Sequence, residues 1–210
     1  MLRRRNERGD TLIEVLFAVA VFSFIVVGAL SIMNQGLAAS QRALEITLVR
    51  QQVDAQAESL RFMHDAYVAV YRPGITFDTT DSETTPAEEW SRMITSVRNT
   101  GIEQASSASS CPERPQSGSF IINTRTARFE PNSLSSFRVA ETYARTIYDG
   151  DNVMTSTDGL WIEAVRSPDV TGSDANTGFI DFHIRACWDT VGQGLPITVG
   201  TIVRLYEPRG

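Results

Sequence analysis

The chain of 210 residues carries 19 basic and 25 acidic side chains, a net charge of −6, and 42% hydrophobic residues. These values are typical of a folded protein, and they suggest neither a globally disordered chain nor a protein with many membrane spans. Every basic residue is arginine, and four of the arginines lie within the first eight positions. The rest of the chain is acidic, which argues against a general nucleic-acid binder. The length fits one soluble domain with an accessory element.

One long apolar run follows the basic start. Residues 15–41 contain no charged side chain, and residues 15–33 are apolar apart from two serines and a glycine. A helix rises about 1.5 Å per residue, so roughly 20 apolar residues cross a hydrocarbon core about 30 Å thick. Because the arginines precede the run, the positive-inside bias predicts a cytoplasmic N-terminus and an extracytoplasmic domain. The sequence therefore predicts a single-pass protein of the plasma (inner) membrane.

Two simpler interpretations of the run are a secretory signal peptide and a plain signal anchor. Gly36-Leu37-Ala38 and Ala38-Ala39-Ser40 are small enough for a signal peptidase. The apolar run, however, is longer than the about 7 to 15 residues of a signal peptide. A plain anchor does not explain Glu14, which lies at the start of the run, where an ionised side chain is unfavourable without a partner. Glu14 therefore indicates a specific function.

The segment Gly9-Asp10-Thr11-Leu12-Ile13-Glu14-Val15 resembles the processing motif of type IV prepilins and type II secretion pseudopilins. In that family a membrane aspartyl peptidase cuts after the glycine and methylates the new amino terminus. The resemblance therefore implies cleavage after Gly9 and methylation of Asp10. The first mature residue of the family is usually phenylalanine or another large apolar residue, so Asp10 departs from the pattern.

Glu14 has a physical role if such subunits assemble through their helices. A carboxylate buried among apolar helices attracts a positive charge, and the α-amine of a neighbouring subunit's Asp10 is the expected partner. This pair would set the axial register between subunits. In the alternative, Glu14 lies shallow at the lipid interface and extends to water.

The helical pattern continues beyond the apolar run as an amphipathic stem. Pro73-Gly74 ends it, which predicts one helix from Leu12 to Tyr71, with Gly28 and Gly36 as weak points. Apolar residues of the stem recur at spacings close to three, four or seven: Leu37, Leu44, Leu48, Val53, Leu60, Met63, Tyr67 and Val70.

A second helix and several strands are expected after the stem. Thr85-Pro86-Ala87-Glu88 combines a capping box with proline at the first helical position, and Asn99-Thr100-Gly101 closes that helix at about Arg98. Residues 103–119 form a serine-rich loop. Turn signals then separate expected strands at Phe120–Thr124, Arg138–Tyr148, Leu160–Arg166, Phe179–Asp189 and Ile197–Tyr206, with one apolar sheet face.

These elements predict an α+β fold of the type IV pilin kind, in which a long N-terminal helix packs against an antiparallel sheet. The transmembrane half of the helix comes first and the amphipathic half follows. The expected parts are a cleaved basic leader (1–9), a transmembrane and assembly helix (10–36), an amphipathic stem helix (37–72), a helix and loop region (73–119) and a sheet region (120–210). The last forms one globular domain with the stem.

Cys111 and Cys187 are the only cysteines. They lie on the predicted outer side of the membrane, where disulfides persist, so a bridge between them is expected, with two unpaired thiols as the alternative. His64 and His183, the only histidines, show no metal-ligand spacing and are expected at the surface.

No metal or other cofactor is expected. Asp149, Asp151 and Asn152, or Asp169 and Asp174, could supply oxygens to calcium, but aspartates beside glycine usually form turns. No motif of a hydrolase, a nucleotide-binding protein or a redox enzyme occurs, so the chain is not expected to be an enzyme.

The resemblance implies a structural subunit, a minor pilin or pseudopilin, of a type IV pilus or a type II secretion-like filament. The expected partners are prepilin peptidase, other pilin or pseudopilin subunits, the inner-membrane assembly platform and membrane lipid, and nucleic acid is not among them. The alternative is a filament-tip adhesin or DNA-uptake receptor. A basic cluster would favour DNA, but Arg125, Arg128, Arg138 and Arg145 are scattered among acids.

Overall fold

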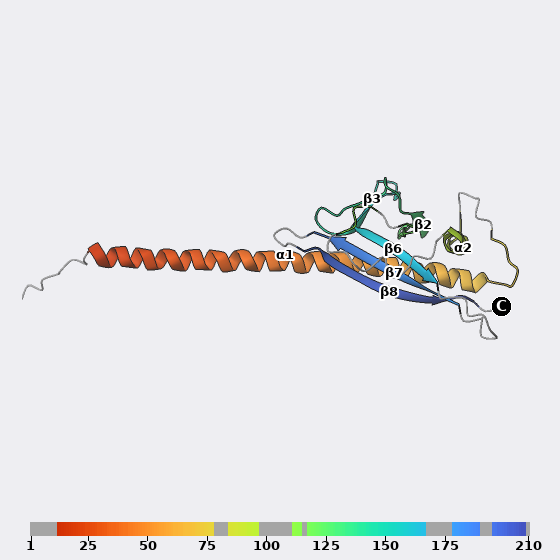
Figure 1. Cartoon of the computed structure of the whole chain (residues 1–210), viewed down its shortest axis with the longest axis horizontal. Helices are drawn as coiled ribbons and strands as arrows, with labels where there is room; N and C mark the ends of the chain where they lie inside the picture. The colour runs from red at the N-terminus through yellow and green to blue at the C-terminus, as the bar shows by residue number, and fades with distance from the viewer. Residues whose placement is uncertain are drawn as a thin grey trace, which may run out of the picture. The chain divides into compact units, whose positions relative to one another are not determined.

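The computed structural model describes residues 12–77, 84–96, 111–114, 117–166, 178–189 and 195–208. The contacts within the chain divide it into two units, Met1–Leu44 and Glu45–Gly210. The first unit contributes the N-terminal part of one helix. The second contains the rest of that helix, a short helix and two sheets (Figure 1).

Helix α1 runs without a break from Leu12 to Val70, which confirms the predicted long helix to within one residue. It passes through Gly28 and Gly36, and neither of these has a non-local neighbour within 4 Å of an added Cβ. In the second unit, α1 buries one face at helical spacing, consisting of Val49, Val53, Gln56, Ala57, Leu60 and Met63. The helix ends just before Pro73, as proline at that position requires.

Helix α2 spans Pro86–Ser96 and begins with the predicted capping box. The backbone N–H of Thr85 donates to Glu88 Oε2 at 2.6 Å, and the N–H of Glu88 donates to Thr85 Oγ1 at 3.4 Å. These two bonds satisfy donors that a helix start leaves unpaired. The expected stop at Asn99-Thr100-Gly101 lies outside the described residues. Figure 1 places α2 beside the sheet.

The larger sheet has five antiparallel strands in the order β2-β1-β6-β7-β8. Figure 1 shows β6, β7 and β8 lying along the C-terminal half of α1. This arrangement confirms the expected α+β architecture. The strand bounds are Phe120–Asn123 for β1, Arg128–Pro131 for β2, Leu160–Arg166 for β6, Phe179–Trp188 for β7 and Ile197–Tyr206 for β8.

A second, three-stranded sheet was not expected. It has the order β3-β5-β4, formed by Phe137–Arg138, Met154–Asp158 and Arg145–Tyr148 respectively, and its β3–β5 pair is parallel. The predicted continuous strand Arg138–Tyr148 is wrong because the chain leaves β3 after Arg138 and re-enters a sheet only at Arg145. Between them Ala140 forms an isolated parallel bridge with Trp188, so this stretch contacts the larger sheet instead.

Gly159 joins the two sheets at the passage from β5 to β6. Its φ of +60° is a conformation that glycine adopts without strain. An added Cβ would lie 2.2 Å from the carbonyl oxygen of Cys187, so no larger residue fits there. The Gly159 N–H donates to Arg138 O at 2.7 Å, and its carbonyl accepts from Cys187 N at 2.8 Å. The first bond continues the pairing with β3 of the small sheet, and the second attaches this sheet to β7.

The core of the second unit lies between α1, α2 and the larger sheet. Phe182 of β7 is its centre, since its ring lies 5.6 Å from the Trp90 ring of α2 and 6.2 Å from the Phe120 ring of β1. Buried polar side chains also connect the layers. Gln56 of α1 donates to Ile122 O at 2.8 Å and accepts from Ile122 N at 3.0 Å.

Candidate functional site

The first unit presents apolar side chains all around α1. Phe17, Phe24 and Ile13 each expose more than two thirds of their surface, and none of the most apolar 18-residue window is buried. Exposed apolar surface of this extent is unfavourable in water, at about 25 cal/mol per Å². By length and composition this helix can cross a membrane.

Polar groups in this part of α1 are few. Ser23 donates its hydroxyl to Val19 O at 2.8 Å, so within the helix itself its donor is satisfied without water. Glu14 lies in the first helical turn, where a carboxylate interacts favourably with the positive end of the helix dipole. The predicted processing residues, Gly9 and Asp10, lie outside the described residues, as does the basic leader.

The structure joins Cys111 to Cys187 of β7, with their Cα atoms 5.5 Å apart. Both are buried in a small apolar cluster with Phe137 of β3 and Trp161 of β6. The predicted pair is therefore compatible with the fold, and the link spans a sequence separation of 76 residues. Its formation in the natural protein stays a prediction.

The expectation that both histidines lie at the surface is wrong for His183, which is 8% exposed. Desolvation and the nearby Arg185 lower the pKa of His183 from its ordinary value, while Asp181 and Glu163 raise it. Glu163, its cross-strand neighbour, is also buried and accepts from Trp161 Nε1 at 3.1 Å. Strand alternation treats this face of β6 and β7 as exposed, whereas Trp161 and Cys187 on the same face pack with Phe137 and Cys111.

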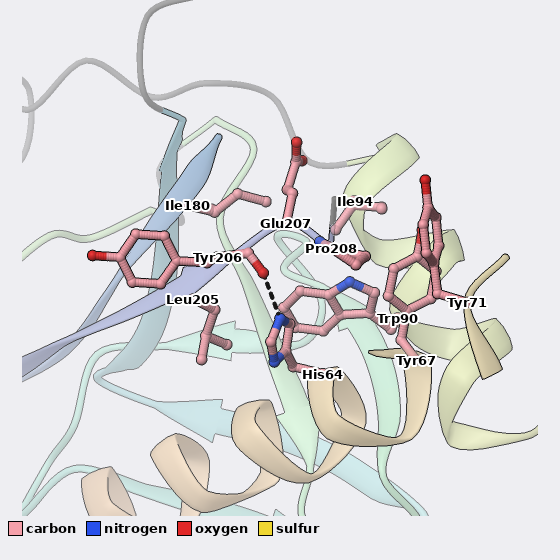
Figure 2. Close-up of a pocket in the computed structure, with 10 residues that line it drawn as sticks. All are labelled: His64, Tyr67, Tyr71, Trp90, Ile94, Ile180, Leu205, Tyr206, Glu207 and Pro208. Carbon is pink, nitrogen blue, oxygen red and sulfur yellow. Dashed lines mark hydrogen bonds between the residues drawn. The ribbon is translucent and has the colours of Figure 1, made fainter. Parts of the chain in front are cut away.

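His64 lies partly buried in a small pocket where α1, α2 and the end of β8 meet (Figure 2). The cavity holds about 160 Å³. His64 Nε2 shares a hydrogen bond of 2.9 Å with Tyr206 O, and its ring contacts the edge of Trp90 at 5.1 Å. His64 of α1 thus contacts both α2 and the end of β8. Tyr67 lines the same pocket, and burial raises its pKa, which the nearby Tyr71 and Glu207 raise further.

Two of the candidate calcium ligands, Asp149 and Asn152, form hydrogen bonds with other groups of the domain. Asp149 Oδ1 accepts from the N–H groups of Asp151 and Val153, each at 2.9 Å. Asn152 has a φ of 63°, and its Oδ1 accepts from Arg125 at 2.6 Å. Among the residues that the structure describes, no group of three metal-binding side chains occurs. Asp169 and Asp174 lie outside those residues.

The arginines considered for DNA contact have local partners. The Arg125 guanidinium lies 4.2 Å from the centre of the Tyr148 ring. Arg145 lies 3.8 Å from Asp158 and 5.4 Å from the Tyr143 ring. The guanidinium groups of Arg125 and Arg145 therefore already interact with side chains of the domain.

Comparison with known proteins finds one match. Residues 4–30 match the family described as the prokaryotic N-terminal methylation motif. No curated protein and no solved structure matches the chain. The match covers the basic leader, the predicted cleavage site, Glu14 and the first part of the apolar helix, while the sheet domain has no counterpart among the comparisons.

Proposed function

Because residues 4–30 carry the N-terminal methylation motif that is the signature of prepilins and pseudopilins, we propose that this chain is a structural subunit, a minor pilin or pseudopilin, of a type IV pilus or type II secretion-like filament. The motif supports a precursor of this kind, which belongs to a structural class and not to an enzyme class. The observation that carries the proposal is the motif followed directly by an apolar helix.

The chain acts in three steps in this proposal. The leader of residues 1–9 holds the N-terminus in the cytoplasm while residues 10–36 span the inner membrane as the transmembrane and assembly helix. Prepilin peptidase then cuts after Gly9 and methylates the amine of Asp10. The assembly platform finally extracts the subunit from the lipid, and its apolar helix packs among those of other subunits.

Assembly replaces lipid by protein around the apolar side chains of the first unit. Apolar packing alone is weakly specific for axial position, since many registers bury similar areas. A Glu14 carboxylate paired with the α-amine of a neighbour's Asp10 would select one register, because a shifted helix leaves both charges unpaired in a medium of low polarity. Residues 37–72 form the stem, and residues 73–119 and 120–210 complete the globular domain outside the membrane.

The first prediction is that the mature chain begins at Asp10 with a methylated amine. The chain is produced in membranes with and without prepilin peptidase, and the N-terminus is read by mass spectrometry. Since no lysine occurs, the α-amine is the only amine of the chain, so a primary-amine reagent labels a cut but unmethylated terminus and loses its one site when Asp10 is methylated. A Gly9→Leu variant should remain uncut, and a Gly28→Ala variant should be processed normally. A mature chain that begins at Ser40, or that keeps Met1 in the presence of the peptidase, contradicts the proposal.

A further inference from the structure

Strand β8 forms one edge of the five-stranded sheet, and this edge is long and regular. It has ten residues, and its pairing with β7 shows no register shift from Ile197 to Tyr206. Proteins usually protect such an edge with proline, a bulge or exposed charge. β8 contains no proline, and its one charged residue, Arg204, donates two hydrogen bonds of 2.7 Å to Asp181 of β7. Among the described residues, this edge therefore shows no proline and no bulge, and its one exposed charge, Arg204, is paired within the sheet.

The ladder shows which backbone groups of β8 face outward. Glu207 N donates to Gly178 O at 2.9 Å, so the N–H and C=O groups of every second residue counted back from Glu207 face β7. The groups of the residues between them face away from the sheet, and these residues are Thr198, Gly200, Ile202, Arg204 and Tyr206. Tyr206 O is taken by His64. Within the described part of the chain, the other four residues show no hydrogen bond on their outward backbone groups.

The opposite edge of the same sheet is closed. β2 has only four residues and ends at Pro131. Helix α2 supplies partners for the backbone of Phe129, since its N–H donates to Glu89 Oε2 at 3.0 Å and its carbonyl accepts from Arg92 Nη2 at 2.9 Å. Within the part of the chain that the structure describes, a helix thus covers one edge of the sheet, and no element supplies partners to the outward backbone groups of Thr198, Gly200, Ile202 and Arg204 on the other.

The direction of β8 decides which kind of strand can pair with it. Trp188, the partner of Ile197, donates to Glu45 at the start of the second unit's part of α1, and Tyr206 meets His64 further along. β8 therefore runs in the same direction as α1. If all subunits of a filament point the same way, as the proposed function requires, the β8 strands of two copies also share one direction. The usual symmetric pairing of two identical edges is antiparallel and needs opposite directions, so a second copy cannot pair with this edge in that way.

The side chains of β8 indicate the sequence of a suitable strand. Val203 is buried, and Ile197, Val199 and Leu205 are only partly buried against the core. The apolar layer therefore continues to the margin of the sheet, and an added strand with apolar side chains at every second position would cover it. We propose that the β8 edge binds an extended, alternately apolar segment of a different protein, which pairs antiparallel with β8 as a sixth strand.

The proposal is tested by photo-crosslinking in the cells that naturally produce the full-length chain. A photoreactive amino acid replaces Thr198, an exposed residue of the edge strand, and as a control position it replaces the exposed Val153, which precedes the small sheet. Each of these two photoreactive variants also carries either Ile202→Pro or, as a matched control, Ile202→Val. Residue 202 directs its N–H away from β7, so proline there leaves the β7–β8 ladder intact and removes one donor for an added strand.

The expected result is an adduct at position 198 with a second protein, mapped by mass spectrometry to an alternately apolar segment. The adduct should persist in Ile202→Val and fall by roughly tenfold in Ile202→Pro, since proline removes a bond and adds a steric block. If the proline variant does not fold, Ile202→Lys replaces it. An adduct of two copies of this chain, an equal adduct in the proline variant, or none above the Val153 control overturns the proposal. N-terminal sequencing of the same samples reports processing, so a failure of the proposed filament function is seen separately.

Discussion

Two polar residues of α1, Glu14 and Gln56, lie among apolar neighbours. Glu14 is the one acidic residue in the first turn of a helix whose following residues are apolar. Gln56 is fully buried on the other part of that helix and bonds to both backbone groups of Ile122. Each is a polar group in an apolar setting, and such groups are retained when they select one arrangement among several of similar apolar contact.

The Glu14→Gln variant should be processed normally but enter filaments poorly. Glutamine keeps the size of the side chain and removes the charge, so the α-amine of a neighbour would be buried without its partner. The ratio of sheared filament to membrane-bound protein should fall by roughly tenfold or more. Glu58→Gln, at an exposed position paired with Arg61, is the control and should assemble normally. Normal incorporation of Glu14→Gln would mean that Glu14 only extends to the lipid interface.

The Gln56→Ala variant should destabilise the sheet domain. Alanine leaves the N–H and the carbonyl of Ile122 buried without partners, which costs roughly 2–5 kcal/mol in the free energy of unfolding. Gln51→Ala, at an exposed position on the same helix, should change that free energy by less than about 0.5 kcal/mol. Urea denaturation of the full-length chain in detergent micelles, followed by tryptophan fluorescence, measures both. Equal midpoints would show that water replaces the amide.

At the scale of elements, α2 supplies hydrogen-bond partners to the backbone of β2, the edge strand of the larger sheet. Its first turn carries two glutamates with different roles. Glu88 completes the capping box at the surface, whereas Glu89 is 1% exposed and accepts from the backbone of Phe129. Arg92 lies one turn later, 3.4 Å from Glu89, and donates to Phe129 O. Helical spacing thus places Glu89 and Arg92 on the same side of α2, where they bond to the N–H and the carbonyl of Phe129.

Replacing Glu89 should therefore cost more stability than replacing Glu88. Glu89→Ala leaves a buried N–H of Phe129 unpaired and Arg92 without its carboxylate, which should lower the free energy of unfolding by roughly 2–4 kcal/mol. Glu88→Ala should cost at most about 1 kcal/mol, the value of a helix cap. Thermal unfolding of the two variants, compared under the same conditions, gives the difference. A larger loss for Glu88→Ala would show that the helix cap, and not the bonds of Glu89 and Arg92 to Phe129, holds α2 in place.

At the scale of the whole molecule, Gly159 and the Ala140 bridge join the two sheets, and the Cys111–Cys187 link connects the segment before β1 to β7. All three meet at the end of β7. Cys111 precedes β1 in the chain, so the link connects two parts of the domain that are distant in sequence. Closing a loop of this length removes conformational freedom mainly from the unfolded chain.

The cysteine pair should be oxidised in protein recovered from the outer side of the membrane. Peptide mapping without reduction should recover Cys111 and Cys187 as one linked peptide. The Cys111→Ala/Cys187→Ala double variant should lose about 4 kcal/mol of stability in the chain-entropy model, a large part of a typical 5–15 kcal/mol. Two thiols that react with an alkylating reagent in the native protein would refute the link.

The sequence by itself determined the elements that depend on local patterns. The long helix, the capping box of α2 and strands β6 and β8 follow from periodicity, caps and turn residues, and the motif around Gly9 and Glu14 is local as well. Only the tertiary structure decided the rest. β5 is rich in serine and threonine and shows no apolar alternation, so it becomes a strand because β3 and β4 pair with it. The burial of His183 and the hydrogen bonds of Gln56 have the same cause, since each depends on residues distant in the chain.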